Sequence, residues 1–151
     1  LTVTRTRRAR QTDVVWTDLT NAVATGSAIK KALVGSWNSG GRSTRVVVGD
    51  CWVECNVDDP ATQGGICFGL GNVDSSVSYA DVDFSFLING LGDIYIYESG
   101  TLRGGSHGTH VIGDVYRVAV VGGVVKYYRN GVWLYDSAVV PTMPLFAGIQ
   151  E

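Results

Sequence analysis

From residue 113 to residue 137 the chain reads GDVYRVAVVGGVVKYYRNGVWLYDS, and this stretch decides its fold class. Apolar residues recur along it, and two dipeptides interrupt it, Gly122-Gly123 and Asn130-Gly131. Both dipeptides supply the positive φ that two-residue β-hairpin turns require. The stretch therefore predicts three antiparallel strands, and the two turns set their register.

The predicted register assigns the side chains of these strands to two faces. Counting back from the turns places Arg117 opposite Tyr128 and Tyr128 opposite Trp133. It also places Lys126 opposite Tyr135. The apolar face, which is the predicted core face, carries Val118, Val120, Val125, Tyr127 and Leu134. The opposite face is polar but rich in aromatic residues and carries Arg117, Lys126, Tyr128, Trp133 and Tyr135.

The polar aromatic face is the candidate ligand-binding site. Sugars stack their C–H faces on aromatic rings while polar neighbours bind the hydroxyl groups, which uses the amphipathic character of Tyr and Trp. Trp37, in a predicted loop over residues 36–43, is a further glycan-binding candidate. The alternative is that these rings pack under a loop or against another subunit.

Outside this stretch, short apolar runs separated by turn residues predict about ten strands in total. This spacing is typical of an all-β sandwich or barrel. No run of about 18 apolar residues occurs, so we expect no membrane span. We expect a β-sandwich domain over residues 14–151, preceded by an N-terminal arm or edge strand over residues 1–13.

The N-terminal arm differs in charge from the rest of the chain. The first dozen residues contain four arginines and no acid, although the whole chain of 151 residues has a net charge of −2. The remainder is therefore acidic, which argues against nucleic acid as a partner. The candidate assembly residues of this strand-like arm are Leu1, Val3, Arg5, Arg7, Arg8 and Arg10.

The chain has three cysteines, of which Cys51 and Cys55 lie four residues apart on one predicted strand, too distant to bridge. Cys67 lies on the following strand, so a cross-strand Cys55–Cys67 disulfide fits a hairpin. The alternative is three buried thiols. A disulfide would indicate an oxidising compartment and hence an extracellular location.

Catalytic and metal-binding patterns are weak in this sequence. A glucanase needs two carboxylates on one strand face, and only Asp81 and Asp83 offer such a pair. The same two residues are weak candidates for binding a cation, although paired acids usually mark a solvated face. His107 and His110 lie in a Gly-rich loop that contains no Cys or acid, so we expect a solvated loop there rather than a metal site. We expect no enzyme activity, no cofactor and no metal.

Several short segments together resemble concanavalin A-like lectin/glucanase jelly rolls, most of all the non-catalytic modules of large bacterial secreted and surface proteins. The resemblance covers residues 14–148 and implies a two-sheet antiparallel jelly roll at the cell surface. Such modules normally have one more strand at the C-terminal end, which runs beside the first; here the N-terminal arm of the same or a neighbouring subunit could fill that edge. The segments are VWTDL (15–19), FGL (68–70), YADVDF (79–84), YESG (97–100), GDVYRV (113–118) and YYRNG (127–131).

Three function hypotheses follow from these patterns. The leading one is a structural or adhesive subunit that assembles with identical subunits into a surface filament or layer, by insertion of the arm into the open edge. The second is a carbohydrate-binding, lectin-like module that uses the aromatic face. The third is a glucanase. A capsid subunit is a remoter alternative, because four arginines are few for packaging a genome.

Overall fold

The computed structural model describes residues 11–32, 37–58 and 64–151, which form thirteen strands and one short 3-10 helix, η1 (Tyr79–Asp81). The larger sheet has seven strands in the order β1 (Trp16–Thr20), β4 (Gly40–Val47), β13 (Leu145–Gln150), β6 (Gly65–Gly71), β7 (Phe84–Asn89), β8 (Ile94–Glu98) and β9 (Thr101–Arg103). The second sheet has the order β12 (Val132–Asp136), β11 (Val124–Arg129), β10 (Val115–Val121) and β5 (Cys51–Asn56). A separate hairpin pairs β2 (Ala22–Thr25) with β3 (Ala28–Lys31).

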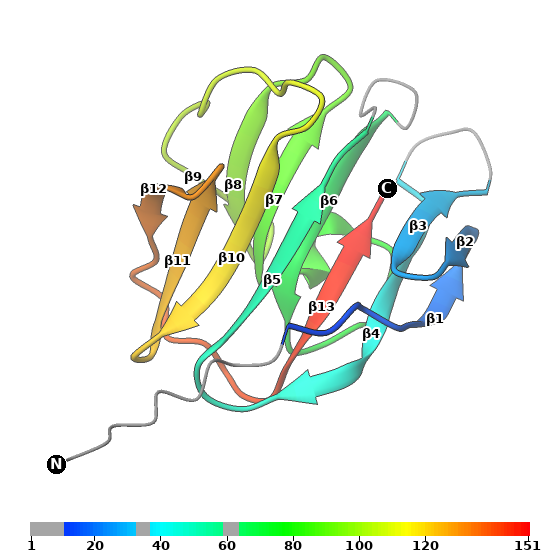
Figure 1. Cartoon of the computed structure of the whole chain (residues 1–151), viewed down its shortest axis with the longest axis horizontal. Coiled ribbons are helices and arrows are strands. Elements are labelled where there is room, and N and C mark those ends of the chain that lie inside the picture. Colours follow the sequence, from blue (N-terminus) through cyan, green and yellow to red (C-terminus); the bar gives the residue numbers. More distant parts are fainter. Residues whose placement is uncertain (1–10, 33–36, 59–63) are drawn as a thin grey trace, which may run out of the picture.

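The four-stranded sheet lies in front of the seven-stranded sheet, as Figure 1 shows. The chain crosses from the seven-stranded sheet to the four-stranded sheet at β5 and crosses back at β6. It enters the four-stranded sheet a second time at β10. Among the described residues, no helix is both long and apolar enough to cross a membrane.

Apolar side chains between the two sheets form the core. The ring of Phe86 on β7 packs edge-on against that of Tyr127 on β11, with the centroids 5.5 Å apart. The Tyr116 ring on β10 lies 5.1 Å from Phe86, and all three side chains are fully buried. Burial of a side chain of this size stabilises the fold by about 2–3 kcal/mol, so these rings join the sheets firmly.

Both predicted hairpin turns are present. Gly122 and Gly123 have φ of 57° and 82°, and Asn130 and Gly131 have φ of 52° and 76°, so all four residues are left-handed. This conformation is the one that a type I′ turn requires. The β10–β11 hairpin keeps the predicted register over its full length.

The second hairpin departs from its predicted register within β12. Tyr135 pairs with Tyr127, and Asp136 pairs with Lys126, so the predicted pairing of Lys126 with Tyr135 is wrong. The cause is a bulge, in which Leu134 is the extra residue. Leu134 and Tyr135 both pack against the core as a result. The Tyr135 ring lies 5.8 Å from the Tyr127 ring, so Tyr135 leaves the polar face.

Two other local predictions are corrected. The sequence predicts a loop at residues 40–43, but these residues begin β4. Positions 40 and 41 of this strand need glycine, because neighbouring atoms occupy the space that a side chain would fill. Val82 was expected on the core face, but β7 begins only at Phe84. Val82 instead packs on the outer side of the seven-stranded sheet, where an added Cβ on Gly148 would lie 3.5 Å from it.

The predicted Cys55–Cys67 disulfide is absent, and all three cysteines are free thiols. β5 and β6 do not form a hairpin; they belong to different sheets. Cys55 packs against the core, whereas Cys67 belongs to the cluster on the outer side of the seven-stranded sheet. Burial raises the pKa of both thiols to about 12, and it also raises the pKa of Cys51.

The predicted N-terminal arm lies outside the described residues, so its strand character is not tested. The described chain begins with residues 11–15, which run along β4 before β1. The Thr44 amide donates to the Val15 carbonyl at 2.8 Å, and Arg45 donates to the Thr12 hydroxyl at 3.0 Å. The residues predicted to take part in assembly lie outside the described residues; they are Leu1, Val3, Arg5, Arg7, Arg8 and Arg10.

Candidate functional site

One row of side chains crosses the outer face of the four-stranded sheet from edge to edge. Glu54 on β5 pairs with Arg117 on β10, and Arg117 pairs with Tyr128 on β11. Tyr128 in turn pairs with Trp133 on β12. Directly paired residues of antiparallel strands point to the same face, so these four side chains lie side by side.

A second row lies two residues along the strands on the same face. It contains Trp52 on β5, Ala119 on β10, Lys126 on β11 and Asp136 on β12. Asp136 reaches this row because of the bulge at Leu134, which shifts the end of β12 by one residue. Together the two rows form the outer face, the name used below for these eight residues.

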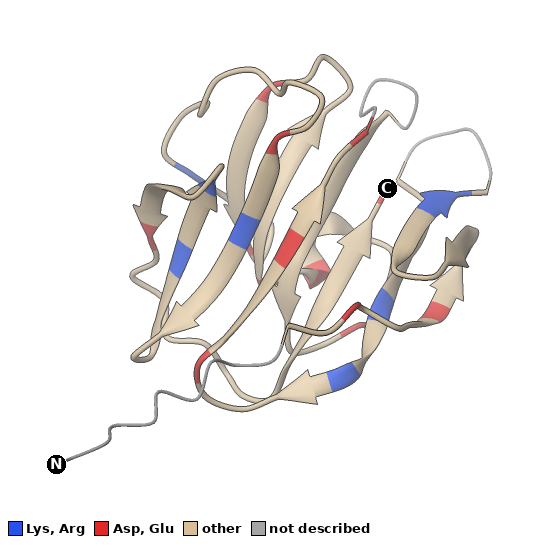
Figure 2. Cartoon of the chain, viewed as in Figure 1, with Lys and Arg blue, Asp and Glu red and all other residues tan. Residues whose placement is uncertain are grey.

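The charges of the outer face are paired across strands. The Arg117 guanidinium donates to Glu54 Oε2 from Nε at 2.9 Å and from a terminal nitrogen at 2.6 Å. Lys126 Nζ lies 2.6 Å from Asp136 Oδ2. Figure 2 shows a basic band beside an acidic band on β10 and β5. Hydrogen bonds from Lys126 and Trp133 lower the pKa of Asp136, which keeps it ionised.

The two tryptophans of the outer face have different surroundings. The Arg117 guanidinium lies over the Trp52 ring, 4.5 Å from its centroid, so Trp52 supports this arginine by a cation–π contact. Trp133 donates from Nε1 to Asp136 Oδ1 at 2.7 Å, and the residue is 57% exposed. The Trp133 ring is therefore held in place by its nitrogen while remaining open to solvent.

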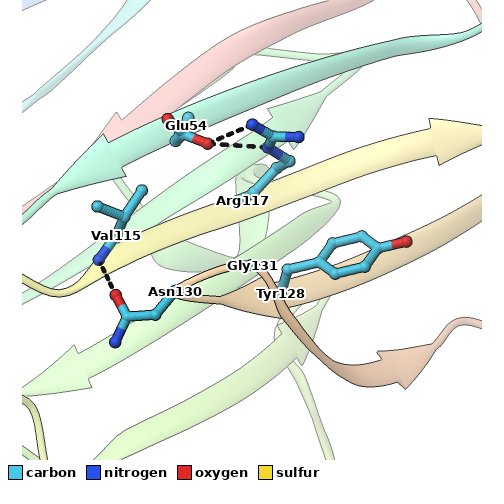
Figure 3. Close-up of a pocket in the computed structure, with 6 residues that line it drawn as sticks. All are labelled: Glu54, Val115, Arg117, Tyr128, Asn130 and Gly131. Atoms are coloured by element: carbon cyan, nitrogen blue, oxygen red, sulfur yellow. Dashed lines mark hydrogen bonds and ion pairs between the residues drawn. The ribbon is translucent and has the colours of Figure 1, made fainter.

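A hollow of about 600 Å³ opens on the outer face. Asn130 borders it in a fixed position, because its Oδ1 accepts from the Val115 amide at 2.8 Å and its Nδ2 donates to Asp114 at 2.7 Å. Figure 3 shows Glu54 and Arg117 at one side and Tyr128 extending along the other. The hollow is lined by Glu54, Val115, Arg117, Tyr128, Asn130 and Gly131.

The structure brings together four of the six predicted glycan-binding residues. Arg117, Lys126, Tyr128 and Trp133 share the outer face, whereas Tyr135 packs against the core and Trp37 lies elsewhere. The Trp37 ring packs on the outer side of the seven-stranded sheet. There its centroid is 5.6 Å from that of Tyr79.

The sequence did not indicate the β5 residues of this face. β5 joins β10 across nearly sixty residues of intervening chain, and no local turn reports that pairing. Asp136 was missed because of the bulge. A detectable signal was that Glu54 is the one charged residue of this strand, since an opposite charge directly across is the stabilising partner.

The two acids considered for catalysis or cation binding have local structural roles. Asp81 Oδ2 accepts hydrogen bonds from Ser75 and Ser76, and Asp83 accepts from the Asn72 amide at 2.7 Å. These contacts hold the loop between β6 and β7 against the sheet. Within the described residues, no group of three or more His, Cys, Asp or Glu side chains has a metal-binding arrangement.

The histidine loop is exposed over most of its length, as expected of a solvated loop, but not at His110. The His110 side chain is 3% exposed, and its Nδ1 lies 2.7 Å from the Tyr116 hydroxyl. His110 therefore packs at the end of the core next to Asp114. Partial burial lowers the pKa of His107, the other histidine of this loop.

Comparison with known proteins identifies the architecture. No family model and no curated protein sequence matches this chain. It is similar to the carbohydrate-binding module CBM66 from Bacillus subtilis, at 14% identity over 90% of this chain and 86% of that one, with a TM-score of 0.55. It is also similar to the SPRY domain of human HERC1, at 13% identity over 74% of this chain and 73% of that one, with a TM-score of 0.50.

A third similar structure is a β-glucanase from Bacillus licheniformis, at 14% identity over 75% of this chain and 57% of that one. The TM-score with this enzyme is 0.44. At such identities structural similarity shows the fold and leaves function open. The fold is an all-β jelly-roll sandwich, which confirms the predicted fold class.

Proposed function

We propose that this chain is a non-catalytic carbohydrate-binding module whose ligand lies on the outer face of the four-stranded sheet. The observation that carries the proposal is the row formed by Glu54, Arg117, Tyr128 and Trp133. An exposed ring, a partly exposed ring and fixed polar groups are thereby aligned across the sheet. The row is longer than one sugar ring, so it suits a chain of sugars.

The chemistry of the row matches the needs of a sugar ligand. Sugar rings have apolar C–H faces that pack on aromatic rings, and the exposed Trp133 ring offers such a surface. Binding sites combine aromatic surfaces with a few fixed polar groups that orient the ligand. Glu54 and Arg117 are fixed by their mutual hydrogen bonds, so they need no reordering when a ligand arrives.

The acidic content of the hollow favours binding of a sugar rather than its hydrolysis. Glycoside hydrolases generally use two carboxylates that flank the scissile bond. Among the residues that line the hollow, Glu54 is the acid, and its Oε2 receives both hydrogen bonds from Arg117. The residues that line the hollow therefore offer no second carboxylate for such a pair.

Removing either aromatic ring of this row should abolish most of the binding. We expect Trp133→Ala and Tyr128→Ala each to weaken binding to the glycan that the wild type selects on a polysaccharide array by about tenfold, the upper range for one aromatic contact. The matched control is Tyr95→Ala, which removes a partly exposed tyrosine from the outer side of the other sheet. Circular dichroism should show the folded state in all three variants.

The control also locates the site. Loss of binding in Tyr95→Ala, with Trp133→Ala and Tyr128→Ala unaffected, would move the ligand to the aromatic cluster around Trp37 and Tyr79. Failure of the wild type to bind any glycan on the array would contradict the proposal itself.

The proposal implies an extracellular or cell-surface location, where polysaccharides are encountered. The predicted disulfide no longer supports that location, since the cysteines are free. A glycan ligand is now the argument for it.

A second candidate function is self-assembly through the N-terminal arm, and the position of β5 favours it. β5 is an edge strand, because no other strand of the described residues pairs with its second side. Asp50, Glu54 and Asp58 lie on β5 or next to its ends. An arginine-rich segment of an identical subunit would add a strand to this edge with matching charge.

Deleting residues 1–12 tests this second function. We expect the full chain to form polymers visible by electron microscopy and the shortened chain to remain monomeric in sedimentation experiments. A variant with glutamine in place of Arg5, Arg7, Arg8 and Arg10 separates charge from strand addition. Polymers that survive the deletion, or a full chain that stays monomeric, would exclude arm-driven assembly.

A further inference from the structure

The outer face is electrically balanced, and this balance bears on the class of glycan that it would bind. Each basic side chain of its two rows has an acidic partner within 2.6 Å, Arg117 with Glu54 and Lys126 with Asp136. An anionic polysaccharide would meet a carboxylate beside each basic group, and repulsion between like charges would oppose its binding. A neutral ligand leaves both ion pairs intact.

The pairing of Glu54 with Arg117 leaves two polar atoms available. Both hydrogen bonds from Arg117 reach the same oxygen, Glu54 Oε2. Among the described residues, no hydrogen bond uses Glu54 Oε1 or the second terminal nitrogen of Arg117. A strong acceptor and a strong donor therefore lie at the two ends of the ion pair, at the border of the hollow (Figure 3).

Such a pair suits two neighbouring hydroxyl groups. A hydroxyl group both donates and accepts hydrogen bonds. One hydroxyl of a vicinal pair can donate to Glu54 Oε1 while the other accepts from Arg117. The Trp52 ring holds the guanidinium from the adjacent row, so the donor has a fixed direction. The Tyr128 ring follows in the same row and can contact the apolar face of the sugar.

We infer that the outer face selects a neutral polysaccharide with free vicinal hydroxyl groups, and that the Glu54–Arg117 pair recognises this diol. This inference rests on the proposed carbohydrate-binding function. It adds to that function the class of the ligand and the two residues that recognise it. It predicts weak dependence on ionic strength, because the ligand brings no charge that salt can screen.

The test uses the full chain and immobilised polysaccharides of two classes. The neutral probes are β-1,4-mannan, xylan backbone oligosaccharides, inulin and cello-oligosaccharides, and the anionic probes are polygalacturonate and chondroitin sulfate. Periodate treatment cleaves the carbon–carbon bond of vicinal diols, so it provides a matched ligand control. We expect at least one neutral probe to bind with little effect of added sodium chloride, and periodate to abolish that binding.

Glu54→Gln tests the pair itself. Loss of a hydrogen bond to a charged group should weaken neutral-ligand binding about tenfold. The same substitution leaves Arg117 without a counter-charge, so we expect salt-sensitive binding to polygalacturonate to appear. Asp93→Asn, a change in a loop away from the outer face, is the control and should alter neither property.

The outcomes separate the inference from the function on which it rests. Binding of anionic probes alone, or neutral binding that survives periodate, overturns the inference while carbohydrate binding stands. Binding of neither class overturns the proposed function and the inference with it. Unchanged neutral binding in Glu54→Gln overturns the role of the pair.

Discussion

Asp114→Ala is expected to lower the free energy of unfolding by about 3–5 kcal/mol, the range for removing one partner of a buried ion pair. The Asp114 side chain is 9% exposed, and Arg129 donates to it from two nitrogens, at 2.6 and 3.1 Å. It also accepts from Asn130 at 2.7 Å, from the Val111 amide at 2.8 Å and from Tyr116 at 3.3 Å. The substitution would remove all of these hydrogen bonds and leave the largely buried Arg129 guanidinium without its counter-charge at the end of the core.

Urea denaturation measures this loss, with Asp136→Ala as the matched control. Asp136 also accepts from a basic residue, Lys126 at 2.6 Å, but it is exposed. An exposed pair contributes about 1 kcal/mol or less. Equal effects of the two substitutions would contradict the structural role assigned to Asp114.

The same contacts give the protein an acid-sensitive component of stability. Burial alone would raise the pKa of Asp114, but hydrogen bonds from Arg129, Asn130 and Val111 and the charge of Arg129 hold it well below its usual range. This contribution is therefore complete above the unfolded-state value, about 4, and is lost as pH falls further. We expect Asp114→Asn to lose less stability than wild type between pH 5 and pH 2, by urea denaturation at each pH.

Gly69→Ala is expected to cost about 3 kcal/mol or more, at or above the usual upper range for overpacking. A Cβ at Gly69 would collide with the Phe84 carbonyl oxygen and lie 2.9 Å from the Ser85 Cα. The collision is with backbone of β7, and β6 and β7 are interior strands of the seven-stranded sheet. Neither strand can shift without disturbing its second neighbour.

Gly105→Ala is the control for this second substitution. No atom lies within 4 Å of the Cβ position at Gly105, and its φ is not left-handed. A change of no more than about 0.5 kcal/mol is expected there. Thermal unfolding of both variants decides the point, and a Gly69→Ala protein as stable as Gly105→Ala would contradict the packing described.

The success of prediction from sequence depended on how local each signal was. The Gly122-Gly123 turn fixes its own hairpin, so the pairing of Arg117 with Tyr128 could be counted outward from it. The pairing of Tyr128 with Trp133 followed in the same way. Beyond Trp133 the predicted register of β12 was wrong, because Leu134 is an extra residue in a bulge. A bulge has no distinct sequence pattern in an apolar strand.

Non-local contacts could not be read from the sequence in the same way. Cys55 and Cys67 are close in sequence, but the chain changes sheets between them, which removed the hairpin that the predicted disulfide required. Glu54 meets Arg117 only because β5 pairs with β10. Four of the eight residues of the outer face were therefore visible from local pattern, whereas Glu54 and Trp52 on β5 required the three-dimensional structure.

The central claim is that a sugar chain binds across β5, β10, β11 and β12. Two-dimensional NMR of the isotopically labelled chain, titrated with the neutral polysaccharide fragment selected on the array, tests this claim most directly. We expect the largest shifts at the indole N–H of Trp133 and at the backbone amides of Glu54, Arg117 and Tyr128. Shifts confined to the cluster around Tyr79, or no shifts at all, would contradict the claim.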